Sequence, residues 1–160
     1  MVVDVDRREP WYSIGLLILR LGVAGYLLTH GWGKFQMLAG GKFDQFGDPI
    51  GIGATASLIL IFFAEFVCSI LVIIGLGTRF AAIPVVIAMG VAAFVAHGGD
   101  PWTAGGGASL FFAGESQSWA SKEPALVFLL VFLSLAFTGA GRFSLDALIA
   151  RARAKRRGEA

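Results

Sequence analysis

The stretch that decides the fold is LLILRLGVAGYLLTHGWGKF, residues 16–35. Its length and apolar content are typical of a membrane-spanning helix, which needs about 20 mostly apolar residues. Its ionisable groups are unusual, because Arg20 lies near the middle and His30 and Lys34 lie at one end. A central arginine costs about 2.5–3.5 kcal/mol on insertion, and each neighbouring Leu, Ile or Val returns about 0.3–0.6 kcal/mol. We therefore predict a first span over Trp11–His30 in which Arg20 needs a partner.

The composition of the whole chain is that of a membrane protein. Its 160 residues are 56% hydrophobic and only 15% charged, whereas soluble domains are about 25% charged. Three further apolar segments without strand-like alternation follow the first: Ala54–Leu76, Phe80–Ala96 and Pro124–Ala140. We predict an all-α membrane protein, a four-transmembrane-helix bundle over residues 11–143.

The distribution of basic residues predicts the orientation of the bundle. Four spans place both ends of the chain on one side, so residues 1–10 form a tail on the same side as the C-terminus. Cytoplasmic termini put nine basic residues inside and three outside, in agreement with the positive-inside rule. The nine are Arg7, Arg8, Arg79, Arg142, Arg151, Arg153, Lys155, Arg156 and Arg157, and the three are Lys34, Lys42 and Lys122.

Residues 144–160 form a basic amphipathic tail. Ser144 is a suitable N-cap, and Asp146 is favourable in the first helical turn. Leu145, Leu148 and Ile149 supply an apolar face, and five basic residues follow. We predict a short cytoplasmic helix that lies on the membrane surface as a topology anchor, with docking of a partner as the alternative.

Glu65 is the only acidic residue within a predicted span. Counted from the same side of the bilayer, Arg20 is nine residues from the end of its span and Glu65 is eleven from the end of its own. At about 1.5 Å per residue the two lie at similar depth. We predict an intramembrane ion pair between them. The readings left open are a latch that fixes helix register, a site that binds a polar headgroup or relays protons, and no pairing of the two side chains.

The only two histidines, His30 and His97, each end an outward-running span in a His-Gly pair. The topology places both at the outer membrane face, with Lys34 nearby and the long connection 97–123 above. We select His30, Lys34 and His97 as candidate ligand or quinone-binding residues, because these groups hydrogen-bond carbonyls and exchange protons near neutral pH. The alternatives are simple capping of helix ends and a metal site. Typical metal sites need more ligands, so we predict none.

Other residues bear on packing and exclude some chemistry. Gly15, Gly22 and Gly25 are predicted to let helices approach closely, within the chain or across a homo-oligomer. The single cysteine, Cys68, supports no internal disulfide and no dithiol chemistry. The basic residues cluster beside a span, so we predict no nucleic-acid partner.

Several motifs, taken in order, resemble the DoxX family of small bacterial and archaeal membrane proteins. They are RLGVAGYLLTHGWGK in the first span, Glu65 followed by GLGTRFAA, HGGD after the third span, and KEPALVFLL with LAFTGAGRFSLD near the end. The likeness extends over Leu16–Leu148. By matching position, the polar motifs of the family include Arg20, His30, Lys34, Glu65, Arg79 and His97.

The resemblance implies a multi-pass protein of the inner (cytoplasmic) membrane. It also implies an accessory subunit of a membrane-bound, quinone-linked redox complex, with the lipid bilayer and other redox subunits as partners. No covalent cofactor is expected, and quinone is the candidate ligand. One alternative is a quinone-linked oxidoreductase acting on thiosulfate or a similar sulfur compound, so catalytic activity of the chain is left open. Another is a small-molecule carrier that uses the pair of Arg20 and Glu65.

Overall fold

A computed structural model describes residues 9–102 and 121–158 of the chain. The first long helix joins three segments: α1 (Glu9–Leu19), the π-helical turn η1 (Arg20–Ala24) and α2 (Gly25–Ala39). The second joins α3 (Ala54–Phe62), η3 (Phe63–Val67) and α4 (Cys68–Ile74). The third joins α5 (Thr78–Val91) and η4 (Ala92–Ala96), and α7 (Glu123–Thr138) and α8 (Leu145–Arg157) follow.

The described residues confirm an all-α membrane protein. Three helices are long and apolar enough to cross a membrane, namely Pro10–Ala39, Ala54–Ile74 and Thr78–Ala96, and Glu123–Thr138 is a shorter apolar helix. Large apolar side chains on the outer faces of the helices are exposed, as expected of surfaces that meet lipid. Together these four helices form the predicted bundle.

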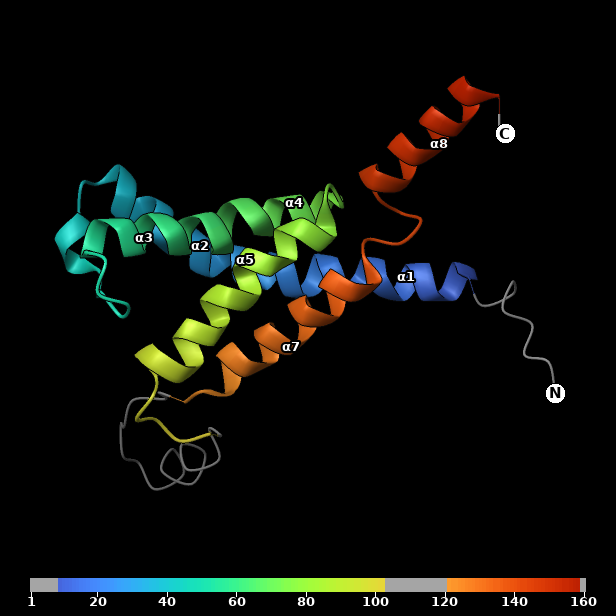
Figure 1. Cartoon of the computed structure of the whole chain (residues 1–160). Coiled ribbons are helices and arrows are strands. Elements are labelled where there is room, and N and C mark those ends of the chain that lie inside the picture. Colours follow the sequence, from blue (N-terminus) through green and yellow to red (C-terminus); the bar gives the residue numbers. More distant parts are fainter. Residues whose placement is uncertain (1–8, 103–120, 159–160) are drawn as a thin grey trace.

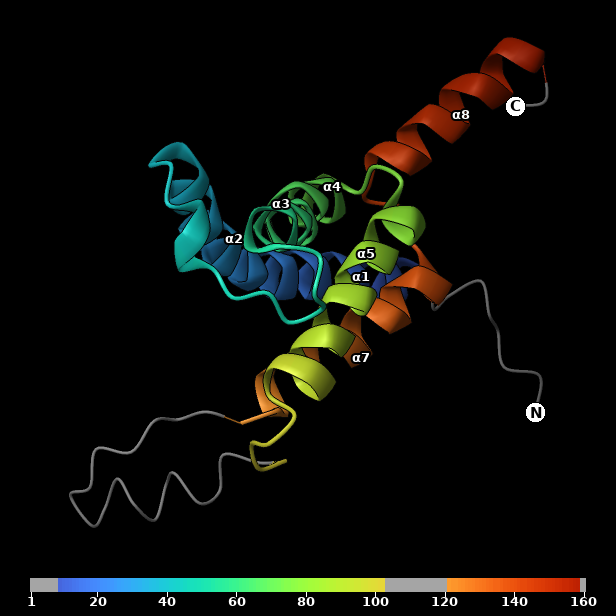
Figure 2. The ribbon, with the colours of Figure 1, turned by 60° about the vertical axis from the view of Figure 1, so that its left-hand side comes forward.

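The helices are arranged as two pairs that meet at one end (Figure 1). The helix α3–α4 runs back along α1–α2, while α5 and α7 lie side by side and cross the first pair at an angle in both views (Figures 1 and 2). Fully buried apolar side chains from all four helices form the core, including Leu27, Val72, Val85 and Phe132. This arrangement gives the bundle two unlike ends.

We name the two ends by their residues. At the basic end lie the start of α1, the hairpin 75–77, the end of α7 and the whole of α8 (Figure 1). At the histidine end lie the end of α2, the connection 40–53, the end of η4 and the start of α7 (Figure 2). Residues 1–8 and most of the predicted 97–123 connection lie outside the described residues.

The first span differs from its predicted bounds, because the helix continues past His30 to Ala39. Glycines after His30 suggested a helix end, but Gly31 has a packing role. A Cβ at Gly31 would lie 2.7 Å from the carbonyl group of Glu65 and the nitrogen of Phe66. Only glycine lets α2 approach η3 this closely, and the helix ends further on, at Gly40 and Gly41.

The predicted packing role of Gly15, Gly22 and Gly25 is not found within the described chain. A Cβ at any of these three positions would meet nothing within 4 Å. The closely packed glycine of the first span is instead Gly31, which sits in the His-Gly motif. A helical repeat of small residues does not say which face of the helix a neighbour covers, and packing of these three glycines across a homo-oligomer stays a prediction.

A tight hairpin joins α4 to α5, and no side chain of the hairpin itself caps α5. Gly75 and Gly77 take left-handed conformations there, with φ of 73° and 58°. The carboxylate of Asp146 accepts hydrogen bonds from the backbone N–H groups of Gly77 (2.9 Å) and Thr78 (3.3 Å). The cap therefore comes from α8, about 70 residues further along the chain.

The predicted C-terminal helix is present as α8 (Figure 1). Ser144 is its N-cap, since the side-chain oxygen accepts a hydrogen bond from the N–H of Ala147 at 3.2 Å. The backbone N–H of Asp146 also donates to the carbonyl of Gly75 at 3.0 Å. Hydrogen bonds to the hairpin thus hold the first turn of α8, and the basic residues follow beyond it.

Candidate functional site

The structure replaces the predicted ion pair between Arg20 and Glu65 with two separate interactions. Arg20 is fully buried, and its guanidinium turns toward the basic end. Nη1 donates to the carbonyl of Ala140, and Nη2 donates to those of Ile73 (3.2 Å) and Phe143 (3.0 Å). These acceptors lie in or after the last turns of α4 and α7, where backbone carbonyls lack helical partners.

The predicted pair was wrong because equal depth of two Cα atoms does not fix where long side chains end. An arginine side chain extends several ångströms along its helix and carries its charge with it. Here the charge reaches carbonyls at negative helix ends, which suit a cation.

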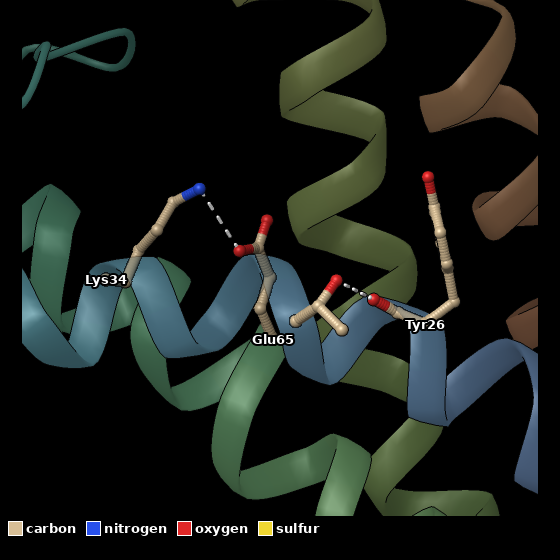
Figure 3. Close-up of polar contacts among 4 residues, drawn as sticks. Tyr26, Lys34 and Glu65 are labelled. Atoms are coloured by element: carbon tan, nitrogen blue, oxygen red, sulfur yellow. Dashed lines mark hydrogen bonds and ion pairs between the residues drawn. The ribbon is translucent and has the colours of Figure 1, made fainter.

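Glu65 lies in η3 and is paired with Lys34 of α2 (Figure 3). The Lys34 Nζ is 3.3 Å from the Glu65 Oε2, and the two side chains are 24% and 8% exposed. The distance is that of an ion pair between a buried carboxylate and a partly exposed ammonium group. Lys34 is one helical turn beyond His30, so both side chains share one face of α2.

A cavity of about 720 Å³ lies between the two helix pairs toward the histidine end. Most of its wall is apolar, formed by α3, α5, η4 and α7. The polar or ionisable side chains in that wall are His30, Lys34, Ser57, Glu65, His97 and Ser121. The three candidate ligand-binding residues therefore line one cavity together with Glu65, whereas Arg20 and Arg79 do not.

His97 extends the polar part of the cavity wall through Asp100. Its Nδ1 is 2.7 Å from the Asp100 Oδ2, and both side chains are partly exposed. An ionised carboxylate only accepts hydrogen bonds, so Nδ1 carries the shared proton and Nε2 is left for another partner. Asp100 is the last residue of the HGGD motif, and its distance of three residues from His97 was a signal that the sequence reasoning did not use.

His30 lies among aromatic rings where α2 meets α7. Its ring centroid is 5.6 Å from that of Tyr26 and 6.2 Å from that of Phe128, both edge-on. Tyr26 and Phe128 are stacked at 5.9 Å. These contacts hold the imidazole beside the apolar wall while the side chain stays exposed.

Ser121, which lies just before the predicted fourth span, also lines the cavity. Its residue is 5% exposed, and its hydroxyl has no hydrogen-bond partner among the described residues. Buried hydroxyl groups are normally paired, so this one is an available donor or acceptor. With Glu65 and His97, it gives the cavity unused hydrogen-bonding capacity on more than one helix.

The connection 40–53 forms one side of the cavity through Phe46, Pro49 and Ile50. Asp48 anchors this segment to the start of α3. Its carboxylate accepts hydrogen bonds from the N–H groups of Ile52 (3.0 Å) and Gly53 (2.7 Å) and from the hydroxyl of Ser57 (2.9 Å). Sequence reasoning did not identify this cap, because Asp48 lies six residues before the helix.

The structure brings together no candidate metal cluster within residues 9–102 and 121–158. No group of three or more His, Cys, Asp or Glu side chains lies close enough there to hold an ion. Cys68 is buried and free. The polar groups in the cavity wall suit hydrogen bonding to a ligand whose remaining surface is apolar.

Comparisons with known proteins agree on one family. A family model described as DoxX matches residues 15–98, which include α2, η3 and η4 beside the cavity. An "Uncharacterized protein" from Haemophilus influenzae is 34% identical over 147 residues, 89% of this chain and 94% of that protein. An "Uncharacterized membrane protein" from Mycobacterium tuberculosis is 35% identical over 137 residues, 82% of this chain and 78% of that protein. No solved structure matches.

Proposed function

The chain belongs to the DoxX family of membrane proteins, and on that premise we propose that it is an accessory subunit of a membrane-bound, quinone-linked redox complex. We place the quinone headgroup in the cavity at the histidine end. The observation that carries this proposal is the joint presence of His30, Lys34, Glu65 and His97 in one mostly apolar cavity.

The size and chemistry of the cavity support a quinone. Its volume of about 720 Å³ falls within the roughly 300–1,000 Å³ range of ligand sites. The apolar walls on α3, α5 and α7 suit an aromatic ring and an apolar tail, and the exposed apolar helices border the lipid that holds such molecules. A small polar region in an apolar cavity is also the general form of a site that fixes ligand orientation.

The polar side chains supply the hydrogen bonds that two carbonyl groups require. Lys34 and the Ser121 hydroxyl are donors, and the Nε2 of His97 donates when the ring is protonated. When bound, the quinone supplies the capacity to take up electrons and protons. The chain holds and orients the headgroup, and His97, with Nδ1 held by Asp100, exchanges a proton at Nε2.

The electron carriers are assigned to partner subunits. The chain has one cysteine, and Cys68 is buried in the core, so a dithiol cannot form within the subunit. An accessory role fits this distribution of chemistry better than independent oxidation of a sulfur compound. The carrier alternative loses the pair of Arg20 and Glu65 on which it rested, because Arg20 is bonded to backbone carbonyls.

The binding part of the proposal is tested by titrating a short-chain quinone into the purified full chain in nanodiscs and measuring heat of binding. Ala92→Phe fills part of the cavity and is expected to weaken binding about ten-fold or more, whereas Ala150→Phe on exposed α8 leaves it unchanged. His30→Ala and His97→Ala are expected to weaken it less. Equal affinity in the wild type, Ala92→Phe and His30→Ala would remove the quinone assignment.

The accessory role is tested separately by purifying the tagged chain from native membranes with mild detergent. Mass spectrometry and a visible absorption spectrum are expected to reveal subunits that carry haem or flavin. A chain that purifies alone and reduces quinone with a small sulfur compound would instead establish the oxidoreductase alternative.

A further inference from the structure

A second pocket, of about 370 Å³, lies at the basic end, remote from the histidine end. Its lining comes from the start of α5, the residues after α7 and the first turn of α8. The members that matter here are Arg79, Phe80, Thr138, Gly139, Ser144 and Asp146. The proposed quinone site uses none of these residues, so the pocket needs an explanation of its own.

Arg79 is the cation of this pocket, and the chain leaves it available. Its side chain is exposed and makes no hydrogen bond or ion pair within the described parts of the chain. The side chain lies against Gly139, where a Cβ would come within 3.1 Å of the Arg79 Nε. Because Gly139 has no side chain, the Arg79 side chain can lie directly against the backbone at the end of α7.

Among the described residues of the lining, Asp146 is the only acidic one, and its carboxylate already has hydrogen-bond partners. Both of its carboxylate oxygens accept hydrogen bonds from backbone N–H groups of the hairpin, Gly77 and Thr78. An ion pair with Arg79 would compete with these bonds. The guanidinium of Arg79 therefore keeps its donors for a group from outside the chain.

The surroundings indicate which external group is suitable. Further basic side chains lie at the same end on α8 and just before it, namely Arg142, Arg151, Arg153, Lys155, Arg156 and Arg157. On the bundle side, Phe80 of α5 and Phe137 of α7 are 80% and 76% exposed. A cation flanked by further positive charge on one side and bare apolar helices on the other is complementary to an anionic phospholipid.

We propose that the pocket lined by Arg79 and Gly139 binds the headgroup phosphate of an anionic phospholipid, with the acyl chains along Phe80 and Phe137. Arginine presents planar, paired donors that match phosphate oxygens, which a lone ammonium does not. The basic residues of α8 add a longer-range attraction that concentrates acidic lipid at this end. The first turn of α8, held by the hairpin, closes one side of the headgroup site.

The test uses native mass spectrometry of the delipidated full chain in neutral detergent with short-chain phosphatidylglycerol or phosphatidylcholine. The wild type is expected to retain phosphatidylglycerol preferentially. Arg79→Gln is expected to weaken that binding about ten-fold, as for loss of a charged hydrogen bond. Arg153→Gln removes the same charge from exposed α8, outside the pocket lining, and is expected to lower the affinity far less than Arg79→Gln does. Arg79→Lys retains the charge but not the paired donors, and is expected to fall between the wild type and Arg79→Gln.

Three results would overturn the proposal. Equal losses in Arg79→Gln and Arg153→Gln would show that net charge, not the pocket, holds the lipid. Displacement of the lipid by millimolar inorganic phosphate would assign the pocket to a free anion instead. Lack of preference for phosphatidylglycerol in the wild type would remove the site altogether. Thermal unfolding of each variant confirms that the chain is folded before binding is compared.

Discussion

Buried charged side chains have different surroundings at the two ends of the bundle. At the basic end, Arg20 donates to three backbone carbonyls and fastens α1–α2 to the ends of α4 and α7. Only its Nε lacks a partner within the described residues. At the histidine end, the pair of Lys34 and Glu65 borders a cavity, and nearby groups keep unused hydrogen-bonding capacity.

This difference separates a structural charge from a candidate functional one. Both sites lie at π-helical turns, since Arg20 begins η1 and Glu65 lies within η3. Such turns are frequent at functional sites, but here the turn alone does not discriminate. The two ends differ in what surrounds the charged side chain. Arg20 is enclosed by backbone carbonyls of the protein, whereas Glu65 lies beside a cavity that has room for a ligand.

The strongest test of the comparison is Arg20→Leu. The substitution removes the donors of three carbonyls that have no other hydrogen-bond partner within residues 9–102 and 121–158, and each buried unsatisfied group costs about 1–3 kcal/mol. We expect a loss of at least about 3 kcal/mol in the free energy of unfolding, measured by thermal and denaturant unfolding in detergent. Arg142→Leu, at an exposed arginine of the same end, should unfold like the wild type. A loss of unfolding free energy no larger than that of Arg142→Leu would mean that the hydrogen bonds of Arg20 do not hold the helices together.

A smaller effect is expected from Gly31→Ala. The new Cβ would lie 2.7 Å from backbone atoms of Glu65 and Phe66, so α2 and η3 must move apart, at a typical overpacking cost of about 1–3 kcal/mol. Gly33→Ala is the matched control two residues away, because nothing lies within 4 Å of its Cβ. Unfolding experiments should show destabilisation in the first variant alone, and equal stability of both would contradict the close approach.

A double-mutant cycle compares the observed and the expected partners of Glu65. Lys34→Met and Glu65→Gln should show a coupling energy of about 1 kcal/mol, modest because Lys34 is partly exposed. Arg20→Leu and Glu65→Gln should show a coupling energy near zero, because the two side chains interact with different groups at opposite ends of the bundle. A larger coupling for the second pair would restore the original prediction.

The smallest effect concerns Asp48, where the connection 40–53 is anchored. Its hydrogen bond from the N–H of Gly53, together with those from Ser57 and Ile52, lowers the pKa of the carboxyl group below its usual value. A group whose pKa is lowered in the folded state stabilises the fold above its unfolded pKa of about 3.9. That contribution is lost as the pH falls through the lower, folded pKa.

Amide hydrogen exchange measures this effect locally. In the wild type, protection of the Ile52 and Gly53 amides should decrease as acid protonates Asp48. In Asp48→Asn, protection should be weaker at neutral pH and should no longer change over that acidic range. Identical pH profiles in the two proteins would show that the carboxylate does not hold the connection in place.

Much of the fold was predictable because it depends on local properties. Apolar runs of sufficient length identified the spans, and the capping residue Ser144 marked the start of α8. Predictions were wrong where the outcome depended on a neighbour: the first span does not end at His30, and Arg20 and Glu65 have other partners than each other. A single sequence does not show which helix face another backbone will approach.

The candidate site divides in the same way. Topology alone predicted that His30, Lys34 and His97 would be neighbours, and all three line the cavity. Their role in quinone binding remains a prediction. Ser121 and Asp100 were missed, because their importance comes from an unpaired hydroxyl and a contact to His97 that appear only once the helices are packed.

By itself, the sequence determined that this chain forms a bundle of membrane helices with ionisable residues inside it, because transfer of apolar length into lipid dominates the energetics and requires only composition. Only the tertiary structure decided which group each buried charge meets. Hydrogen bonds and ion pairs act over a few ångströms, and the reach of the Arg20 side chain and the crossing of α5 and α7 over the first helix pair set those distances.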